Sequence, residues 1–227
     1  MFFDWGGTLA QDPEEFADPA QVWTHVLAEF GAHRDVGQIR SAINDADQAV
    51  GPLIYSYLGR TRLFWEIFDA RVLDALAVTS QRPDVVRAVQ QFFDDPVRIR
   101  LYPETRRTLV TLRSRGYRTG VISNHHDGLL RVLRHHELEP LLDTVTYSQE
   151  AGAEKPNPAV FALAVRRAQC EPVDAVHVGN DIDADVGGAR RSGIAPIWIN
   201  RGRVDQDLDC PTILTLDELL PVLESMR

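Results

Sequence analysis

The sequence predicts an α/β fold: a parallel sheet with helices on both faces, and an all-helical domain inserted after the first strand. From about residue 97 onward, short β-branched apolar segments alternate with segments of helical periodicity. Residues 13–96 carry helical stripes without strand-like alternation, and a short apolar run precedes Asp4. Such alternation is typical of right-handed βαβ units. We therefore expect an α/β core from residues 1–12 and 97–227, and a helical domain from residues 13–96.

The first expected strand is unusually short. Only three residues precede Asp4, whereas a strand usually has about 5–6 residues. Either the strand is truncated or the true start of the chain lies upstream. The helical block that follows is predicted from three apolar stripes: Val22, Val26, Leu27 and Phe30; Phe64, Ile67, Phe68, Val72, Leu73 and Leu76; and Val85, Val86, Val89, Phe92 and Phe93.

The later elements are predicted in turn from their boundaries. A helix over residues 103–115 ends at Gly116, a residue that suits a helix C-terminus. A second helix has Pro158 in its first turn, followed by an apolar face over residues 160–168. Strands are expected at residues 118–123, 143–147, 175–178 and 195–199, each of which is short, apolar and bounded by Gly, Pro or Asp.

Composition limits the class of protein. The chain has 227 residues, 44% of them apolar and 25% charged, as in an ordinary globular protein. Its net charge of −9 argues against nucleic-acid or anionic-membrane partners, which attract clustered positive charge. No apolar run is long enough for a membrane span, and no signal peptide is indicated. Cys170 and Cys210 lack metal-ligand spacing and suit the reducing cytoplasm.

The chemistry is predicted from polar residues at strand ends. Asp4, Ser123-Asn124 and Gly179-Asn180-Asp181 each close an apolar run, and Lys155, the only lysine in the chain, lies in a loop after another. Ligands of parallel α/β sheets bind at the carboxyl ends of the strands. These loops would thus deliver a carboxylate, a hydroxyl, an ammonium and an acidic pair to one edge.

That combination suits a phosphoryl group beside a divalent cation. Ser123 and the amides of a helix expected to start after it would receive phosphate oxygens. Carboxylate and carbonyl oxygens are hard ligands that would hold Mg²⁺. Asp4 would act as the nucleophile and form an aspartyl-phosphate, and Lys155 would hold the negative charges of nucleophile and phosphate together.

Four segments resemble the motifs of the haloacid dehalogenase superfamily. They are Phe-Phe-Asp-Trp-Gly-Gly-Thr-Leu, Val-Ile-Ser-Asn, Glu-Lys-Pro-Asn-Pro and His-Val-Gly-Asn-Asp-Ile-Asp-Ala-Asp, in the same order and spacing. The resemblance covers essentially the whole core, and the helical insert matches that superfamily's cap. It implies a Rossmann-like, three-layer α/β core with an inserted cap, and a hydrolase that acts on a small phosphorylated metabolite with Mg²⁺ in the cytoplasm, as a monomer or homodimer.

The resemblance also assigns roles by position. Asp4 is implied as the nucleophile and Lys155 as the lysine of the third motif. Phosphate would be bound with the help of Thr8, Ser123 and Asn124. Metal would be held by Asp4, the carbonyl of Gly6 and the acidic motif that contains Asn180, Asp181 and Asp185. Superfamily members most often have Asp where this chain has Asn180, so either Asn180 or Asp181 would contact the metal; the charge of Asp181 favours it slightly.

One position departs from the phosphatase pattern. Phosphatases of the superfamily usually have a second Asp, two residues after the nucleophile, which protonates the leaving oxygen; here that residue is Gly6. A positioned proton-transfer group contributes about 100- to 10,000-fold in rate, so its loss would affect alkyl phosphates more than aryl or acyl phosphates. Asp12, Glu14 or Glu15 could supply a displaced acid.

Two alternatives to a phosphatase stay open. The first is a phosphoryl-binding homologue without turnover or with weak activity. The second is a metal-independent 2-haloacid dehalogenase, although Asp181 and Asp185 would then leave negative charge uncompensated beside the nucleophile. Phosphonoacetaldehyde hydrolases have a similar first motif but need a lysine in the cap, and residues 13–96 contain none.

Overall fold

The computed structural model describes residues 1–11, 18–57, 60–93 and 95–226. Its centre is a six-stranded sheet with the order β5-β4-β1-β6-β7-β8, in which every neighbouring pair is parallel. The strands are β1 (Phe2–Phe3), β4 (Gly120–Ser123), β5 (Thr144–Tyr147), β6 (Val176–Gly179), β7 (Ala195–Ile199) and β8 (Thr212–Ile213). This arrangement confirms the predicted α/β fold with a parallel sheet.

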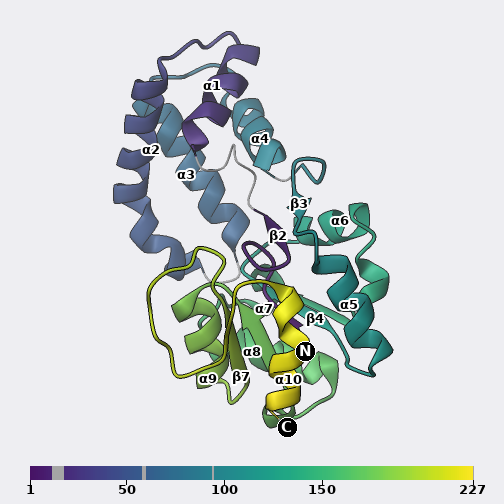
Figure 1. Cartoon of the computed structure of the whole chain (residues 1–227). Coiled ribbons are helices and arrows are strands. Elements are labelled where there is room, and N and C mark those ends of the chain that lie inside the picture. The colour runs from purple at the N-terminus through teal and green to yellow at the C-terminus, as the bar shows by residue number, and fades with distance from the viewer. Residues whose placement is uncertain (12–17, 58–59, 94, 227) are drawn as a thin grey trace.

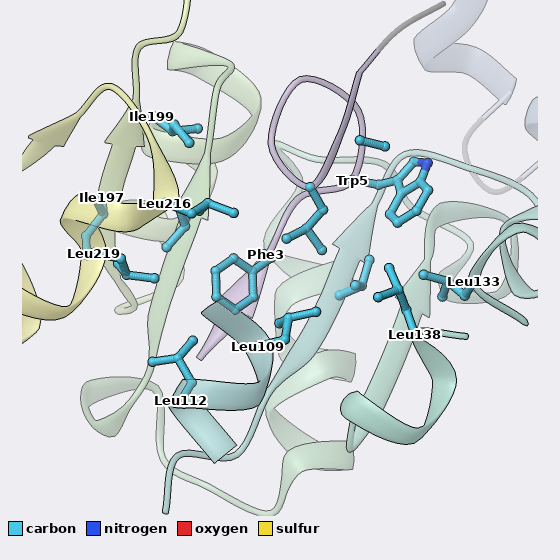
Figure 2. Close-up of a cluster of buried hydrophobic side chains, with 14 of the residues drawn as sticks. Phe3, Trp5, Leu109, Leu112, Leu133, Leu138, Ile197, Ile199, Leu216 and Leu219 are labelled. Atoms are coloured by element: carbon cyan, nitrogen blue, oxygen red, sulfur yellow. The ribbon is translucent and has the colours of Figure 1, made fainter. Parts of the chain in front are cut away.

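Helices cover both faces of the sheet because successive strand residues point to opposite sides. Phe3 packs with side chains of α5 (Thr105–Ser114), α6 (Gly128–His135) and α10 (Leu219–Ser225); Figure 2 shows labelled members of this cluster, among them Phe3, Leu109 and Leu219. Phe2 packs instead with α8 (Pro158–Ala168) and α9 (Gly188–Arg191). The core therefore has the three layers that were predicted.

The remaining helices before the sheet resumes are α1 (Pro19–Glu29), α2 (Val36–Val50), a 3-10 helix (Gly51–Tyr57), α3 (Thr61–Ala75) and α4 (Arg82–Phe93). Their buried side chains form a hydrophobic cluster drawn entirely from residues 20–93, and Figure 1 shows these helices gathered at one end of the molecule. The chain enters and leaves this region through a small antiparallel pair, β2 (Ala10–Gln11) and β3 (Arg100–Leu101). The division into domains at residues 12/13 and 96/97 stays a prediction, and residues 12–17 lie outside the described ranges.

The short elements between strands complete the core. They are 3-10 helices at Glu139–Leu141, Pro172–Asp174 and Leu216–Glu218, the four-residue helix α7 (Ser148–Ala151), and a π-helical turn at Ile182–Gly187. At the start of α8, the Asn157 side chain accepts from Ala159 N–H and Pro158 occupies the first turn, so this helix begins where the sequence predicts. After α5, Gly116 has φ of +82°, the left-handed conformation that glycine adopts most easily.

Two features differ from expectation or were not singled out. The helix after Ser123 begins only at Gly128, because the His126 and Gly128 N–H groups donate to the ring nitrogens of His125 and His126 (2.9 and 3.0 Å). Helix α2 was not singled out, although its buried residues Ile39, Ala42, Ala46 and Val50 have helical spacing. Within the described residues, no helix combines the length and apolar character that crossing a membrane requires.

Candidate active site

The carboxyl ends of the central strands lie at the same edge of the sheet, because neighbouring strands are parallel. Strand β1 lies between β4 and β6, and Phe3 is in register with Val121 and Val178. Directly after β1, the Asp4 N–H donates to the carbonyl of Val178 at 2.9 Å. The residues that follow these strands therefore lie at one edge of the sheet.

A cavity of about 360 Å³ opens at this edge. Among the residues that line it are eight of the nine predicted site residues: Asp4, Gly6, Ser123, Asn124, Lys155, Asn180, Asp181 and Asp185. The ninth, Thr8, is fully buried beneath the first loop. The structure thus brings together side chains that come from four separate loops of the sequence.

Lys155 joins two carboxylates. Its Nζ donates to Asp4 Oδ1 at 2.5 Å and to Asp185 Oδ1 at 2.6 Å, and only 4% of the residue is exposed. The loop that carries Lys155 is held by Asn124, because Lys155 N–H donates to Asn124 Oδ1 at 2.7 Å and Asn124 Nδ2 donates to the Lys155 carbonyl at 3.0 Å. Asn124 therefore fixes the backbone from which the ammonium reaches Asp4.

Asp185 is held on both oxygens. Its Oδ1 also accepts from Nε2 of His177 at 2.9 Å, and its Oδ2 accepts from Asp181 N–H at 3.0 Å. Nδ1 of His177 has no hydrogen-bond partner among the described residues. Burial lowers the pKa of His177 despite the nearby Asp185, so the imidazole is neutral and carries its proton on Nε2. Asp185 therefore orients Lys155 and the Asp181 backbone at once.

The pKa values of Asp4, Asp185 and Lys155 are shifted in different ways by burial and by their mutual contacts. Burial raises the pKa of Asp4 to about 7, because desolvation and repulsion by Asp185 outweigh the attraction of Lys155. Burial acts on Asp185 in the same direction, but Lys155 and the His177 hydrogen bond hold its pKa below the ordinary value. Burial lowers the pKa of Lys155 less than the two carboxylates raise it. The ammonium is thus charged at neutral pH, and full ionisation of both carboxylates leaves an excess negative charge beside Asp4.

The side-chain amide of Asn180 lies against the first loop. With its nitrogen turned toward that loop, it donates to the Gly6 carbonyl at 2.8 Å and to Asp4 Oδ2 at 3.2 Å, and it is 3.2 Å from Thr8 Oγ1. Its position is also fixed through its backbone, since Trp198 Nε1 donates to the Asn180 carbonyl at 3.0 Å. One end of this amide therefore contacts two of the atoms predicted to bind metal.

These atoms suit a small hard cation. Neighbouring oxygens in an octahedral Mg²⁺ shell are about 2.9 Å apart, given Mg–O distances of about 2.0–2.1 Å. The amide end of Asn180 lies 2.8 Å from Gly6 O and 3.2 Å from Asp4 Oδ2. Rotation of the amide would place its oxygen there, at a spacing from Gly6 O and from Asp4 Oδ2 that suits a shared cation. The fit depends on carbonyl and amide oxygens, because the described residues contain no group of three or more His, Cys, Asp or Glu side chains that could hold a metal.

The two aspartates of the acidic motif have other partners. Asp181 Oδ1 accepts from Asp183 N–H at 2.9 Å and from Ala184 N–H at 2.7 Å, which caps the π-helical turn. Asp185 is committed to Lys155 and His177. Both residues line the cavity, although Asp185 is only 1% exposed. Of the predicted metal ligands, Asp4 and Gly6 are therefore the ones that the geometry brings into contact with the Asn180 amide.

Sequence reasoning did not identify Arg201 as part of the site. Its guanidinium donates to the carbonyls of Gly7 (3.1 Å) and Thr8 (2.7 Å) and to Glu104 Oε1 (2.8 Å), so it anchors the first loop from nearly the other end of the chain. No local pattern announces this contact. His177 was also not among the predicted site residues. It is buried, but its position on β6 two residues before Gly179 is a local signal that it faces Asp185.

A family model described as a haloacid dehalogenase-like hydrolase matches residues 1–193. A glyceraldehyde 3-phosphate phosphatase of Methanothermobacter thermautotrophicus is 39% identical over 116 residues, 49% of this chain and 50% of that protein. A phosphoserine phosphatase of Thermus thermophilus is 31% identical over 163 residues, 68% of this chain and 64% of that protein. The chain thus spans about half of the length of the first relative and somewhat less than two thirds of the second.

Solved structures resemble the whole chain. A 2-haloacid dehalogenase from Pseudomonas syringae has a TM-score of 0.76 at 22% identity and covers 100% of this chain and 98% of its own. A phosphatase from Thermococcus onnurineus has a TM-score of 0.70 at 25% identity and covers 98% of this chain and 96% of its own. The first likeness shows a shared fold and no more, because the identity is low.

Proposed function

Since this chain belongs to the haloacid dehalogenase-like hydrolases, we propose that it is a Mg²⁺-dependent phosphatase that hydrolyses a small phosphorylated metabolite through an aspartyl-phosphate at Asp4. The observation that supports the proposal most strongly is the contact of the Lys155 ammonium with both Asp4 and Asp185, all three of which line a cavity. The relatives named as phosphatases support the same activity.

The reaction has two displacements. A carboxylate oxygen of Asp4 attacks phosphorus while the ester P–O bond breaks, and the departing oxygen takes up a proton. Water then attacks the phosphorus of the aspartyl-phosphate, which releases inorganic phosphate and restores the carboxylate. Lys155 holds negative charge on the nucleophile and the transferred group together, in a site where burial strengthens electrostatic interactions.

The phosphoryl group would be held by residues of the first two loops. Ser123 lines the cavity beside Asp4 and is proposed to donate its hydroxyl to a phosphate oxygen. Asn124 supports that position from behind by fixing the Lys155 backbone. Thr8 is buried against Asn180, so its proposed part in phosphate binding is to support the loop.

We propose that Mg²⁺ is held by Asp4 Oδ2, the carbonyl of Gly6 and the oxygen of Asn180, with Asp181 and Asp185 nearby. Magnesium usually keeps several waters and few carboxylate ligands, which agrees with one carboxylate among three donors. When bound, the cation would supply positive charge for the phosphate oxygens and lower the pKa of Asp4. Its charge would also offset the excess negative charge that two ionised carboxylates and one ammonium leave.

Glycine at position 6 shapes the substrate preference. It keeps the carbonyl but offers no proton to the leaving oxygen, so we propose that esters with good leaving groups, such as aryl phosphates, react faster than alkyl phosphates. The candidates for a displaced acid, Asp12, Glu14 and Glu15, lie outside the described residues. The proposal includes a cytoplasmic location and a monomer or homodimer. Cys170 and Cys210 are both free thiols, which suits a reducing compartment.

A hydrolysis assay tests the proposal. Wild type, Asp4→Asn and Gly6→Asp are compared on an aryl phosphate and a sugar phosphate, with Mg²⁺ and with a chelator. We expect aryl phosphate turnover that needs Mg²⁺ and is lost in Asp4→Asn, and a larger gain for the sugar phosphate than for the aryl phosphate in Gly6→Asp. Asp205→Asn is a suitable control, because Asp205 is an exposed carboxylate away from the cavity.

The same assay separates the alternatives. Halide release from a 2-haloacid without Mg²⁺ would identify a dehalogenase and overturn the proposal. No turnover of either ester, together with binding of a beryllium fluoride phosphate mimic, would identify a phosphoryl-binding homologue without catalysis.

A further inference from the structure

A second cavity, of about 610 Å³, lies between the helices α1–α4 and the loop after β4. We call it the cap cavity. Five aromatic side chains line it: Trp23, Phe64, Trp65, Phe68 and Phe93. It shares Phe93, Asn124 and His125 with the active-site cavity, so the two cavities adjoin. A molecule with its phosphate beside Asp4 would extend into this aromatic space.

The size of the cap cavity exceeds the needs of a three-carbon phosphate. Its volume lies in the range of about 300–1,000 Å³ that is usual for pockets that bury a drug-sized ligand. Trp23, Phe64 and Phe68 are buried, with exposed fractions of 2%, 2% and 8%, so the inner wall of the cavity is largely apolar. Such a wall gains free energy by excluding water against an apolar group of matching size.

One charged side chain lies in this inner wall. Asp69, on α3, is 5% exposed, and its Oδ2 accepts from Gln90 Nε2 on α4 at 3.2 Å. Gln90 is its only hydrogen-bond partner among the residues that the structure describes. Burial raises the pKa of Asp69 to about 7, as expected for a carboxylate with too few partners. A donor group on a ligand would supply the partner that this carboxylate lacks.

The other charges of the cap cavity are at its rim. Asp47 and Arg62 are both exposed lining residues, and Arg62 is the only arginine or lysine among the described residues that line the cavity. The inner end therefore combines a carboxylate with aromatic faces and lacks a cation. Carboxylates and aromatic faces together attract organic ammonium groups, through charge-assisted hydrogen bonds and cation–π contacts.

We propose that the cap cavity binds the organic part of the substrate, and that this part is an aromatic-sized apolar group with an ammonium that pairs with Asp69. The inference rests on the proposed phosphatase function and narrows its substrate to amine-bearing phosphate monoesters. Asp69 is a specificity residue in this scheme: it contacts the far end of the substrate and takes no part in phosphoryl transfer.

A structural role for Asp69 makes a different prediction. If its hydrogen bond to Gln90 only joins α3 to α4, then Asp69→Asn, which keeps an oxygen acceptor in the same place, affects all substrates equally. If the carboxylate charge binds an ammonium, the same substitution weakens only ligands that carry one. The two roles are therefore separable by ligand charge.

The test uses two esters that differ in one group, para-(aminoethyl)phenyl phosphate and para-propylphenyl phosphate. With wild type, we expect kcat/KM to be at least ~10-fold higher for the amine ester than for the propyl ester, because one charge-assisted hydrogen bond contributes a ratio of about this size. Most of the difference should be in KM. In Asp69→Asn this preference should disappear, because kcat/KM of the amine ester falls to that of the propyl ester measured with the same variant. Asp45→Asn, which removes an exposed carboxylate of α2 that does not line the cavity, should keep the wild-type preference.

Binding of phosphate-free ligands gives an independent measurement. Tryptophan fluorescence or calorimetry would follow para-(aminoethyl)phenol and para-propylphenol. Tighter binding of the amine, lost in Asp69→Asn, supports the inference even if no ester is hydrolysed, in which case only the phosphatase proposal fails. Equal binding and equal kcat/KM of the amine and propyl compounds in wild type overturn the inference, whether or not the esters are hydrolysed. The wild-type comparison decides this point even if Asp69→Asn does not fold.

Discussion

The backbone of Gly7 lies directly against the side-chain amide of Asn180. A Cβ atom at Gly7 would be 2.6–2.9 Å from three atoms of the Asn180 side-chain amide, and Gly7 has φ of +73°, a conformation that side chains other than that of glycine rarely adopt. The first loop is thus shaped so that Asn180 can reach the Gly6 carbonyl and Asp4 Oδ2.

Gly7→Ala should displace Asn180 and weaken Mg²⁺ binding. We expect at least a ~10-fold rise in the Mg²⁺ dissociation constant, because outer partners of a metal site typically affect affinity about 10- to 100-fold, and a loss of about 1–2 kcal/mol in stability from strain. Calorimetric Mg²⁺ titration measures the first effect and thermal unfolding the second. Gly31→Ala is the matched control, since Gly31 has φ of +71° with nothing within 4 Å of its Cβ position. Equal Mg²⁺ affinity in the two variants would contradict the assigned contact.

Removal of the shared ammonium should both inactivate and destabilise the protein. Lys155→Met leaves Asp4 and Asp185 buried without their common partner, which should cost about 3–5 kcal/mol of unfolding free energy and abolish turnover. The double variant Lys155→Met/Asp185→Asn should recover part of the stability and none of the activity. Denaturant unfolding provides the measurement. Arg166→Met, which removes an exposed cation, should stay within about 0.5 kcal/mol of wild type; the same result for Lys155→Met would refute the role of the buried charges.

The two hydrogen bonds between the Asn124 side chain and the Lys155 backbone, which we call the clamp, should affect the catalytic rate more than the stability of the fold. Asn124→Ala removes both hydrogen bonds that hold the Lys155 backbone. A displacement of the ammonium by about 1 Å can lower the rate about 100-fold, so we expect kcat/KM to fall about 10- to 100-fold. Asp35→Ala is a useful comparison, since it removes the cap of α2 and should cost about 1 kcal/mol of stability without loss of activity. If the two variants lose activity in proportion to stability, the clamp has no special role.

Stability should depend on pH through Asp69. Burial raises its pKa from 3.8 to about 7, so the folded chain binds more protons than the unfolded chain between these values. Ionisation of Asp69 in its buried position therefore lowers the free energy of unfolding progressively as pH rises from about 4 to about 7. Above about pH 7 this loss of stability has reached its full size. Asp69→Asn should raise the unfolding free energy by about 2–4 kcal/mol at about pH 8 and by little at about pH 4. Equal gains at both pH values would show that the carboxylate does not titrate as expected. Asp45→Asn serves as the exposed control.

The sequence alone determined the order of the strands β4 to β7, the positions of the helices α5 and α8, and the residues at the strand ends. Local periodicity reports burial on one face, and boundary residues such as Pro158 and Gly116 act within a few positions, so both are visible without tertiary structure. Convergence of Asp4, Ser123, Lys155 and Asn180 also followed, because the carboxyl ends of parallel strands share one edge of the sheet.

Only the tertiary structure decided which atoms meet. Arg201 binds the carbonyls of Gly7 and Thr8 across nearly the whole chain, and the burial of Asp69 depends on how α3 packs against α4. The contacts of Arg201 with the first loop and of Asp69 with Gln90 cannot be predicted from local spacing, because each joins residues far apart in sequence. The two-residue length of β1 has the same cause: its neighbours β4 and β6 hold it on both sides, so pairing compensates for what the strand lacks in length.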